Sequence, residues 1–289
     1  MSRIIYTSVG TSLIEKLNID SERNYRDYKY DDTSETFKQL YDAALNKLKK
    51  QAIKKECSAE INSLETFGIS KDDSLILLLS DSLYGLLCGR ILEEYLRNKV
   101  KKIELFKLEN LNEKNQSGLT RKVLRDLCEL FDDCKFPEKY LNITGGFKSL
   151  IPYFSTLGMI FQIPIFYIFE DAEKITYIPP LPIEFNSNII SGYEKIIFNA
   201  VNNNQISIGE YNQLPENLKI LFERKDNETI TPSILTDILA IKFIEKIKVI
   251  SFSEMYNRNN YDETHYKDME NIIKLIILKV NEHKDRFHV

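Results

Sequence analysis

Histidine is almost absent from this sequence, because its only three copies, His265, His283 and His288, lie close to the C-terminus. Any chemistry carried by the first 260 residues must therefore proceed without imidazole, the most common general acid or base in enzymes. The same region has no cluster of Cys, Asp and Glu with the spacing of metal ligands. These absences argue against most zinc enzymes and triad hydrolases, and we expect no metal or other cofactor.

Paired cysteines are also missing. The four cysteines form no C-x-x-C pair and have no histidine nearby: Cys57, Cys88, Cys128 and Cys134. We therefore expect reduced thiols, buried as small hydrophobic side chains. The sequence has no N-terminal basic segment followed by an apolar run, which would direct export. Both observations favour a cytoplasmic protein.

The sequence also has no excess of positive charge: the formal net charge of its 289 residues is −4. This charge argues against broad binding to a polyanion such as duplex DNA, although a few local donors can hold a small anion. The content of 43% hydrophobic and 28% charged residues is ordinary for a soluble globular protein. The length allows one large domain or two smaller ones.

The sequence contains neither a Walker loop nor a dinucleotide-binding fingerprint, but residues 140–182 contain another glycine turn. There an apolar run ends at Asn142 and Thr144, and Gly145, Gly146 and Lys148 follow. A strand that passes through two glycines into a helix leaves free backbone N–H groups at the helix start, where an anion is favoured. Lys148 adds a positive charge with three donors.

The uncharged residues 149–169 are numerous enough to span a bilayer. However, Pro152, Gly158, Gln162 and Pro164 interrupt the run. Pro152 suits the first turn of a helix, and Pro164 would end that helix. We therefore predict a core helix followed by a buried strand at 165–169, and no membrane association.

Buried strands alternate with helical segments along the first 180 residues. Strands are predicted at residues 4–9, 74–79, 100–108, 140–144, 165–169 and 175–178. Helices are predicted at residues 35–56, 83–98 and 118–131, with a further helix starting near Ser12. This alternation predicts an α/β fold with a mostly parallel sheet and helices on both faces. Gly85 and Gly89 would let one helix pack closely on the sheet.

Three of these strands end in small polar loops, which would meet at one edge of a parallel sheet. The loops are Gly10-Thr11-Ser12, Ser80-Asp81-Ser82 and Thr144-Gly145-Gly146. Each loop alone would be explained by turn formation and helix capping. Three loops together, one beside a lysine, favour a crevice that binds phosphate or a nucleotide. Asp81 suits such a site only by accepting from a ribose hydroxyl, so we expect it to cap the next helix.

Residues after Pro182 are predicted to form a smaller, mainly helical domain. Its helices are expected at residues 190–201, 215–224, 232–248 and 267–282. Thr231 would cap the third of these, with Pro232 in its first turn. A boundary within residues 183–188 gives the predicted domains 1–183 and 184–289.

Four short segments resemble the CARF family, the CRISPR-associated Rossmann-fold sensors, in order and spacing over about residues 3–183. They read SVGTS, LLLSDSLYGLLCGRIL, NITGGFKS and FYIFEDAEKITYIPPLP. The similarity is to the branch that includes stand-alone ring nucleases, and it implies a Rossmann-like domain. It further implies a homodimer that binds cyclic oligoadenylate, the second messenger of type III CRISPR defence, in a two-fold symmetric pocket; we favour cyclic tetra-adenylate. The pocket residues would be Gly10, Thr11, Ser12, Ser80, Asp81, Ser82, Asn142, Thr144, Gly145, Gly146, Phe147 and Lys148.

Some members of this family cleave the ring that they bind, without a metal. A ribose 2′-hydroxyl then attacks the adjacent phosphate while lysine and hydroxyl groups stabilise the developing charge. By resemblance, Lys148 and Ser12 would carry this chemistry here. Family members that cleave also use an arginine, for which Arg90 and Arg121 are the candidates.

The C-terminal domain leaves three alternatives open. Arg258, Asn259 and His265 have the Arg-x4–6-His spacing of HEPN-type ribonucleases, which would make single-stranded RNA a partner and His265 the acid or base. Residues 207–239 fit a winged-helix module of a ligand-responsive DNA-binding regulator equally well. The simplest interpretation of residues 257–264 is a polar surface loop between two helices. We expect ring cleavage rather than RNA cleavage.

Overall fold

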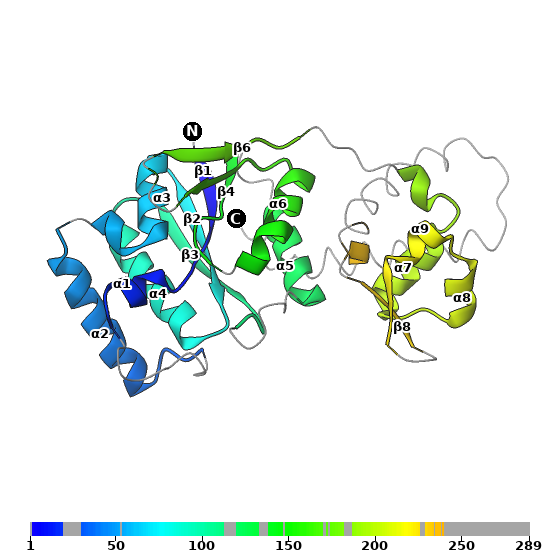
Figure 1. Cartoon of the computed structure of the whole chain (residues 1–289), viewed down its shortest axis with the longest axis horizontal. Helices are drawn as coiled ribbons and strands as arrows, with labels where there is room; N and C mark the ends of the chain where they lie inside the picture. The colour runs from blue at the N-terminus through cyan, green and yellow to red at the C-terminus, as the bar shows by residue number, and fades with distance from the viewer. Residues whose placement is uncertain are drawn as a thin grey trace, which may run out of the picture. The chain divides into compact units, whose positions relative to one another are not determined.

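The structure is a computed structural model of the chain (Figure 1). It describes residues 2–19, 30–52, 54–112, 120–132, 138–146, 148–169, 172, 174–181, 187–225, 229–233, 235–237 and 239. Met1–Ile238 form one compact unit and Leu239–Val289 a second. The second unit lies outside the described residues except for residue 239.

A six-stranded sheet organises the first unit, in the order β3-β2-β1-β4-β5-β6. Its strands are β1 (Arg3–Ser8), β2 (Ser74–Ser80), β3 (Lys102–Leu108), β4 (Glu138–Asn142), β5 (Ile165–Ile168) and β6 (Ile175–Ile178). All neighbours are parallel except β5 and β6. The order is Rossmann-like and confirms the predicted α/β class. The chain builds β2 and β3 on one side of β1 before crossing to β4, so the topological switch lies between β1 and β4.

Helices cover both faces of this sheet, as predicted. Figure 1 shows four helices on one side: α1 (Ser12–Lys16), α2 (Glu35–Lys50), α3 (Ala59–Phe67) and α4 (Leu83–Leu96). On the other side lie α5 (Arg121–Asp132) and α6 (Ile151–Ile160). Alternate residues of β1 face opposite sides, so Ile5 joins the core beneath α4 while Tyr6 packs edge-on against Phe131 of α5.

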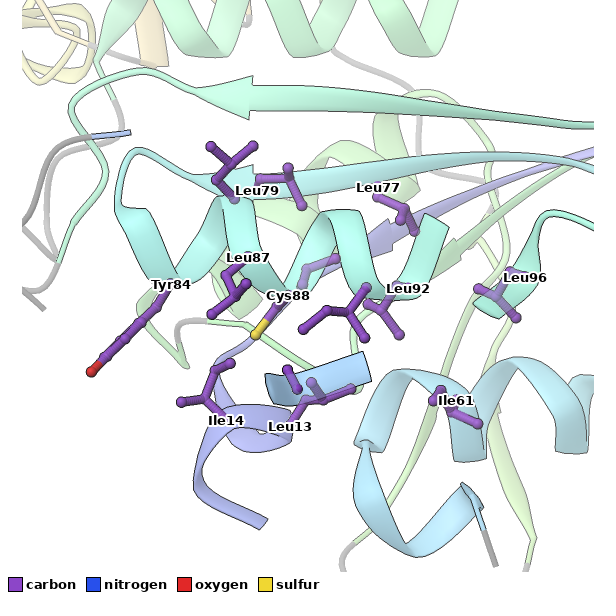
Figure 2. Packing of buried hydrophobic residues seen from close by; sticks show 14 of the residues in the cluster. Leu13, Ile14, Ile61, Leu77, Leu79, Tyr84, Leu87, Cys88, Leu92 and Leu96 are labelled. Carbon is purple, nitrogen blue, oxygen red and sulfur yellow. The ribbon is translucent and has the colours of Figure 1, made fainter. Parts of the chain in front are cut away.

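Helix α4 packs tightly on β2. A Cβ on Gly85 would lie 2.3 Å from the Ser80 Oγ, and one on Gly89 would lie 2.6 Å from a Leu79 methyl carbon. The predicted close packing at these glycines is therefore confirmed. Figure 2 shows the opposite side of α4, where Cys88 points towards Leu13 and Ile14 of α1.

The uncharged run that begins at Ser149 is a helix and a strand, as predicted. Pro152 lies in the first turn of α6, and the buried strand β5 follows Pro164. Among the described helices, none is both long and apolar enough to cross a membrane.

One predicted helix is wrong at its C-terminal end. The helix expected over residues 35–56 ends at Lys50, where Gln51 takes an extended conformation, and a short 3-10 turn follows at η2 (Lys54–Cys57). Helix α3 then starts at a Ser58 cap, whose Oγ accepts from the Ile61 N–H at 3.3 Å. The apolar periodicity runs on past Lys50 without a Gly or Pro to mark the break, and α3 was not predicted.

The part after Pro182 contains strands that were not predicted. Its elements are η4 (Ser187–Ile190), α7 (Glu194–Asn203), α8 (Ile208–Gln213), α9 (Glu216–Lys219), β7 (Phe222–Arg224) and β8 (Ile230–Pro232). The helix predicted over residues 215–224 is wrong beyond Lys219. Leu218, Leu221 and Phe222 have the spacing of one helical face and are all buried, but Leu218 belongs to α9, Leu221 to the turn after it and Phe222 to β7. Thr231 and Pro232 pair with β7 instead of starting a helix, and residues 235–237 are helical.

Two further predictions fall largely on residues that the structure does not describe. They are the domain boundary, of which residues 183–186 lie outside the described ranges, and the helix at 267–282. Both stay predictions.

Two arginines of α5 bind one buried carboxylate near the end of the first unit. The Asp237 side chain is fully buried, and its Oδ1 accepts from the Arg121 Nη2 at 2.7 Å and from the Arg125 Nη2 at 2.8 Å. The Nε atoms of both arginines donate to the same carboxylate, and Arg125 also donates to the Val201 carbonyl at 3.0 Å. These contacts fasten α5 to the C-terminal part of the unit.

Replacement of Asp237 by Asn should therefore destabilise the protein. We expect the Asp237→Asn variant to lose about 1–3 kcal/mol of unfolding free energy, because both guanidinium groups lose a charged acceptor. Urea denaturation would measure the loss. Glu216→Gln is the matched control, because Glu216 also forms an ion pair, with Lys219, but its side chain is 89% exposed. This substitution should change the free energy of unfolding by at most about 0.5 kcal/mol. Equal stability of the two variants would contradict the assigned role.

Candidate functional site

Two glycine loops meet at the switch between β1 and β4. We call residues 9–12 the β1 loop and residues 143–148 the β4 loop; Phe147 in the latter lies outside the described residues. A Cβ on Gly10 would lie only 2.7 Å from the backbone nitrogen of Gly146. The two loops therefore touch through their backbones, and a larger residue at position 10 would force them apart.

A buried carboxyl of α3 lies directly beneath both loops. Glu60 is fully buried, and its Oε1 accepts from the Gly10 N–H at 2.7 Å. Its Oε2 pairs with the Ser58 hydroxyl at 2.6 Å. A Cβ on Gly145 would fall 1.8 Å from the Glu60 Oε1, so this oxygen contacts the β4 loop as well. Burial raises the pKa of Glu60, against the opposing effect of the hydrogen bonds from Ser58 and Gly10.

Sequence reasoning missed Glu60. An acidic residue two positions after a capping serine is normally explained by its favourable interaction with the helix N-terminus, and such residues are usually exposed. The sequence contains one indication that this part of the chain is buried: Ile61 and Leu64, one and four positions after Glu60, are apolar. Only the tertiary structure shows that the carboxyl points into the protein.

Several predicted ligand-binding groups shape the β4 loop. Asn142 is fully buried; its Nδ2 donates to the Ser63 Oγ at 2.8 Å, and its Oδ1 accepts from the Thr144 hydroxyl at 2.7 Å and the Thr144 N–H at 3.2 Å. The Thr144 hydroxyl oxygen in turn accepts from the Ile168 N–H at 3.1 Å. Ser8 donates to the Gly145 carbonyl at 2.5 Å. These side chains hold the loop in place from behind.

Other donors of the two loops have no acceptor among the residues that the structure describes. They are the backbone N–H groups of Thr11, Gly145 and Gly146, all in half-buried residues. Within the same ranges the Ser12 hydroxyl is buried without a hydrogen-bond partner, and the exposed Lys148 ammonium makes no ion pair. The two loops of the predicted crevice therefore carry N–H donors without a described acceptor, a hydroxyl and a lysine, which are groups that anion sites use.

The third predicted loop, at the end of β2, uses its polar groups internally. Ser80 and Ser82 are buried and lie within hydrogen-bonding distance of each other at 2.9 Å, and the Ser82 Oγ accepts from the Gly85 N–H at 3.1 Å. Ser82 is thus the cap of α4, and the prediction that Asp81 caps this helix is wrong. Asp81 instead accepts from the Asn110 N–H at 3.0 Å in the turn after β3.

Both arginine candidates are paired with carboxylates. The Arg90 guanidinium donates to Asp32 at 2.9 Å and to Glu93 at 3.0 Å, while Arg121 binds Asp237 as described above. Arg121 is thus bound to a fully buried carboxylate, whereas Arg90 donates one N–H from each Nη atom and its side chain is 40% exposed.

Other predicted chemistry cannot be located in the structure. The alternative ribonuclease residues Arg258, Asn259 and His265 lie outside the described residues. Within the described ranges, no three His, Cys, Asp or Glu side chains come together in a way that could hold a metal ion.

Residues 55–181 match the model of a CRISPR-associated protein family, Cas_APE2256. The match covers somewhat less than half of the chain and includes Glu60 and the whole β4 loop, whereas the β1 loop lies outside it. This similarity supports an association of the chain with CRISPR systems. No curated protein matches the chain.

The contact between the loops predicts the effect of a single methyl group. Gly10→Ala should lower the free energy of unfolding by about 1–3 kcal/mol, because its Cβ would lie 2.7 Å from the backbone nitrogen of Gly146, and the backbone of the β4 loop would have to shift. Gly209→Ala is the control, since the nearest atom to its Cβ would be 3.9 Å away, and its effect should stay within about 0.5 kcal/mol. Thermal and urea unfolding would measure both. Equal effects of the two substitutions would show that the loops do not touch.

Proposed function

We propose that this chain is a CRISPR-associated sensor that binds cyclic oligoadenylate between the β1 loop and the β4 loop. The observation that carries the proposal is the set of donors at the sheet's switch point that have no acceptor among the described residues, at Thr11, Gly145, Gly146 and Lys148. The similarity of residues 55–181 to a CRISPR-associated family supports it, as does the resemblance to CARF sensors over residues 3–183. We favour cyclic tetra-adenylate as the ligand.

A homodimer would complete this site. One copy of the crevice offers a single lysine and a few N–H groups, whereas a ring of phosphates needs such donors at regular intervals. A two-fold axis beside the loops supplies each of them twice. The net charge of −4 also requires that affinity for the ring comes from these local donors and not from the overall field of the protein.

We further propose that the bound ring is cleaved slowly and without a metal. The ribose 2′-oxygen would attack the adjacent phosphorus in line as its proton leaves, and the 5′-oxygen would depart and take up a proton. Lys148 would stabilise the charge on the phosphoryl oxygens, and the Ser12 hydroxyl would donate to one of them. The ion pairs of Arg90 and Arg121 leave Lys148 as the cation of the two loops.

The test of this proposal is a pair of lysine variants. Calorimetry should show micromolar or tighter binding of cyclic tetra-adenylate or cyclic hexa-adenylate to the wild type. Lys148→Ala should weaken binding by about tenfold or more, which is about 1.4 kcal/mol. Lys101→Ala, an exposed lysine before β3 at the opposite edge of the sheet, should bind like the wild type. Binding of neither ring would end the sensor proposal.

Cleavage is measured by incubating each protein, in excess, with labelled cyclic oligoadenylate in a buffer that contains EDTA to remove metal ions. The wild type should consume the ring, Lys148→Ala should leave it intact, and Ser12→Ala should slow the reaction with little change in affinity. A ring that the wild type binds but leaves uncleaved would make the protein a sensor only.

A second candidate function rests on the elements after Pro182. Helix α7 is followed by Ile206, which pairs antiparallel with Ile230 of β8, and then by α8, α9 and the β7–β8 hairpin. This order resembles a winged-helix module, which would make the protein a ligand-responsive DNA-binding regulator. Acidic residues outnumber basic ones between positions 187 and 237, which disfavours DNA as the partner.

The regulator candidate predicts specific promoter binding that changes when cyclic oligoadenylate is added. Mobility-shift assays at fixed salt would detect it. We expect no specific shift, and a ligand-dependent shift would move this candidate to first place. The ribonuclease alternative at Arg258 and His265 stays a prediction.

A further inference from the structure

Glu60 connects the three elements that form the crevice. Its Oε1 accepts from the Gly10 N–H of the β1 loop at 2.7 Å and contacts Gly145 of the β4 loop, and its backbone belongs to α3. From the same helix, the Ser63 Oγ accepts from Asn142 at the end of β4. One turn of α3 therefore contacts both loops, through Glu60 and through the partner of Asn142.

We propose that Glu60 is a positioning residue of the crevice, whose carboxyl fixes the β1 loop against the β4 loop and couples anion binding to proton uptake. The coupling rests on the function proposed above, whereas the positioning does not.

Both protonation states of Glu60 fit the hydrogen bonds. A carboxylate would accept from Gly10 and from Ser58, and a neutral carboxyl would accept from Gly10 at Oε1 and donate from Oε2 to the Ser58 Oγ. Burial favours the neutral form, so the pKa of Glu60 is raised. Glu60 Oε1 lies against Gly145, so a phosphate held by the Gly145 and Gly146 N–H groups would be close to an ionised Glu60 and would repel it. The ligand therefore favours the protonated state, and binding takes up a proton wherever free Glu60 is ionised.

Few other groups near Glu60 can titrate. The positive charge of Lys16 in α1 favours the ionised form of Glu60, but its effect on the pKa of Glu60 is smaller than those of burial and of the hydrogen bonds. The Cys88 thiol of α4 has a pKa raised well above its ordinary value by burial and by Glu60, so it stays neutral near pH 7. The turn η2, which packs against α3, contributes Cys57 as a buried thiol and Glu56 on its exposed side. The contacts from β1 and β4 are made by serine, asparagine and backbone groups, which do not titrate.

The positioning role is tested without any ligand. Glu60→Gln keeps an acceptor for Gly10 and a donor for Ser58, whereas Glu60→Ala removes both. We expect exchange of the hydrogen-bonded loop amides, Val9, Gly10, Ile143 and Thr144, to be on the order of tenfold faster in Glu60→Ala and nearly unchanged in Glu60→Gln, with α5 as the internal reference. Unchanged exchange in Glu60→Ala, or equal acceleration in Glu60→Gln, would overturn the positioning role.

Stability against pH tests the neutral state independently. Because the pKa of Glu60 is raised in the folded protein, its stabilising effect is complete below the ordinary value of 4.5 and is lost as the pH rises towards the folded pKa. The urea midpoint of the wild type should therefore fall relative to that of Glu60→Gln as the pH rises above 4.5. Parallel curves of urea midpoint against pH for the two proteins would overturn the assignment of a raised pKa to Glu60. This measurement does not use Glu60→Ala, so it can be made even if that variant does not fold.

The proton coupling is tested with cyclic tetra-adenylate over the whole range above pH 4.5 in which the wild type stays folded. The wild-type dissociation constant should rise with pH, by at most about tenfold per unit for one proton, and that of Glu60→Gln should stay flat. A flat wild-type profile, or the same slope in Glu60→Gln, would overturn the coupling. If no ring binds to any variant, the sensor proposal and the coupling fail together, while exchange and stability still decide the positioning role.

Discussion

The hydrogen bond from the Gly10 N–H to the buried Glu60 is the contact on which the crevice depends. A carboxyl without exposure to water must be satisfied by the protein, and here Gly10 and Ser58 provide the two partners. This requirement draws α3 against the ends of β1 and β4. The loops then lie so close that positions 10 and 145 have no room for a Cβ. Removal of any one part would leave a buried polar group without its partner.

In this packing, the side chains and the backbone N–H groups of the loops have different roles. Asn142 and Thr144, which were predicted to contact a ligand, use their polar atoms to hold the backbone, as Ser8 does. The groups left unfilled are mostly backbone N–H groups, which the same hydrogen bonds fix in direction. Fixed dipoles need little rearrangement when an anion binds, and this preorganisation gives them their value in a binding or catalytic site. The motif residues are therefore mainly the support, and the backbone is mainly the site.

Local patterns were enough to predict the six strands, α4 and the convergence of the two glycine loops. These features arise from apolar runs, from periodicity and from the rule that parallel strands end at one edge. Glu60 and α3 could not be predicted, because their role depends on a contact between residues 50 positions apart. The β7–β8 hairpin was missed for a related reason: its strands are only three residues long, and the spacing of Leu218, Leu221 and Phe222 fits a helix equally well.

The pairing of the arginines bears on how fast the proposed chemistry can be. A guanidinium contacts two phosphoryl oxygens at once, whereas an ammonium on a flexible chain acts as a single point charge. Arg90 and Arg121 are held by carboxylates, and the Arg121 pair fastens α5 to the C-terminal part of the unit. Their release would cost ion pairs that the fold uses. Within the two loops, Lys148 is the one charged residue, so the proposed cleavage would have an ammonium and no guanidinium to stabilise its transition state. The proposed function therefore predicts tight binding of the ring with slow turnover.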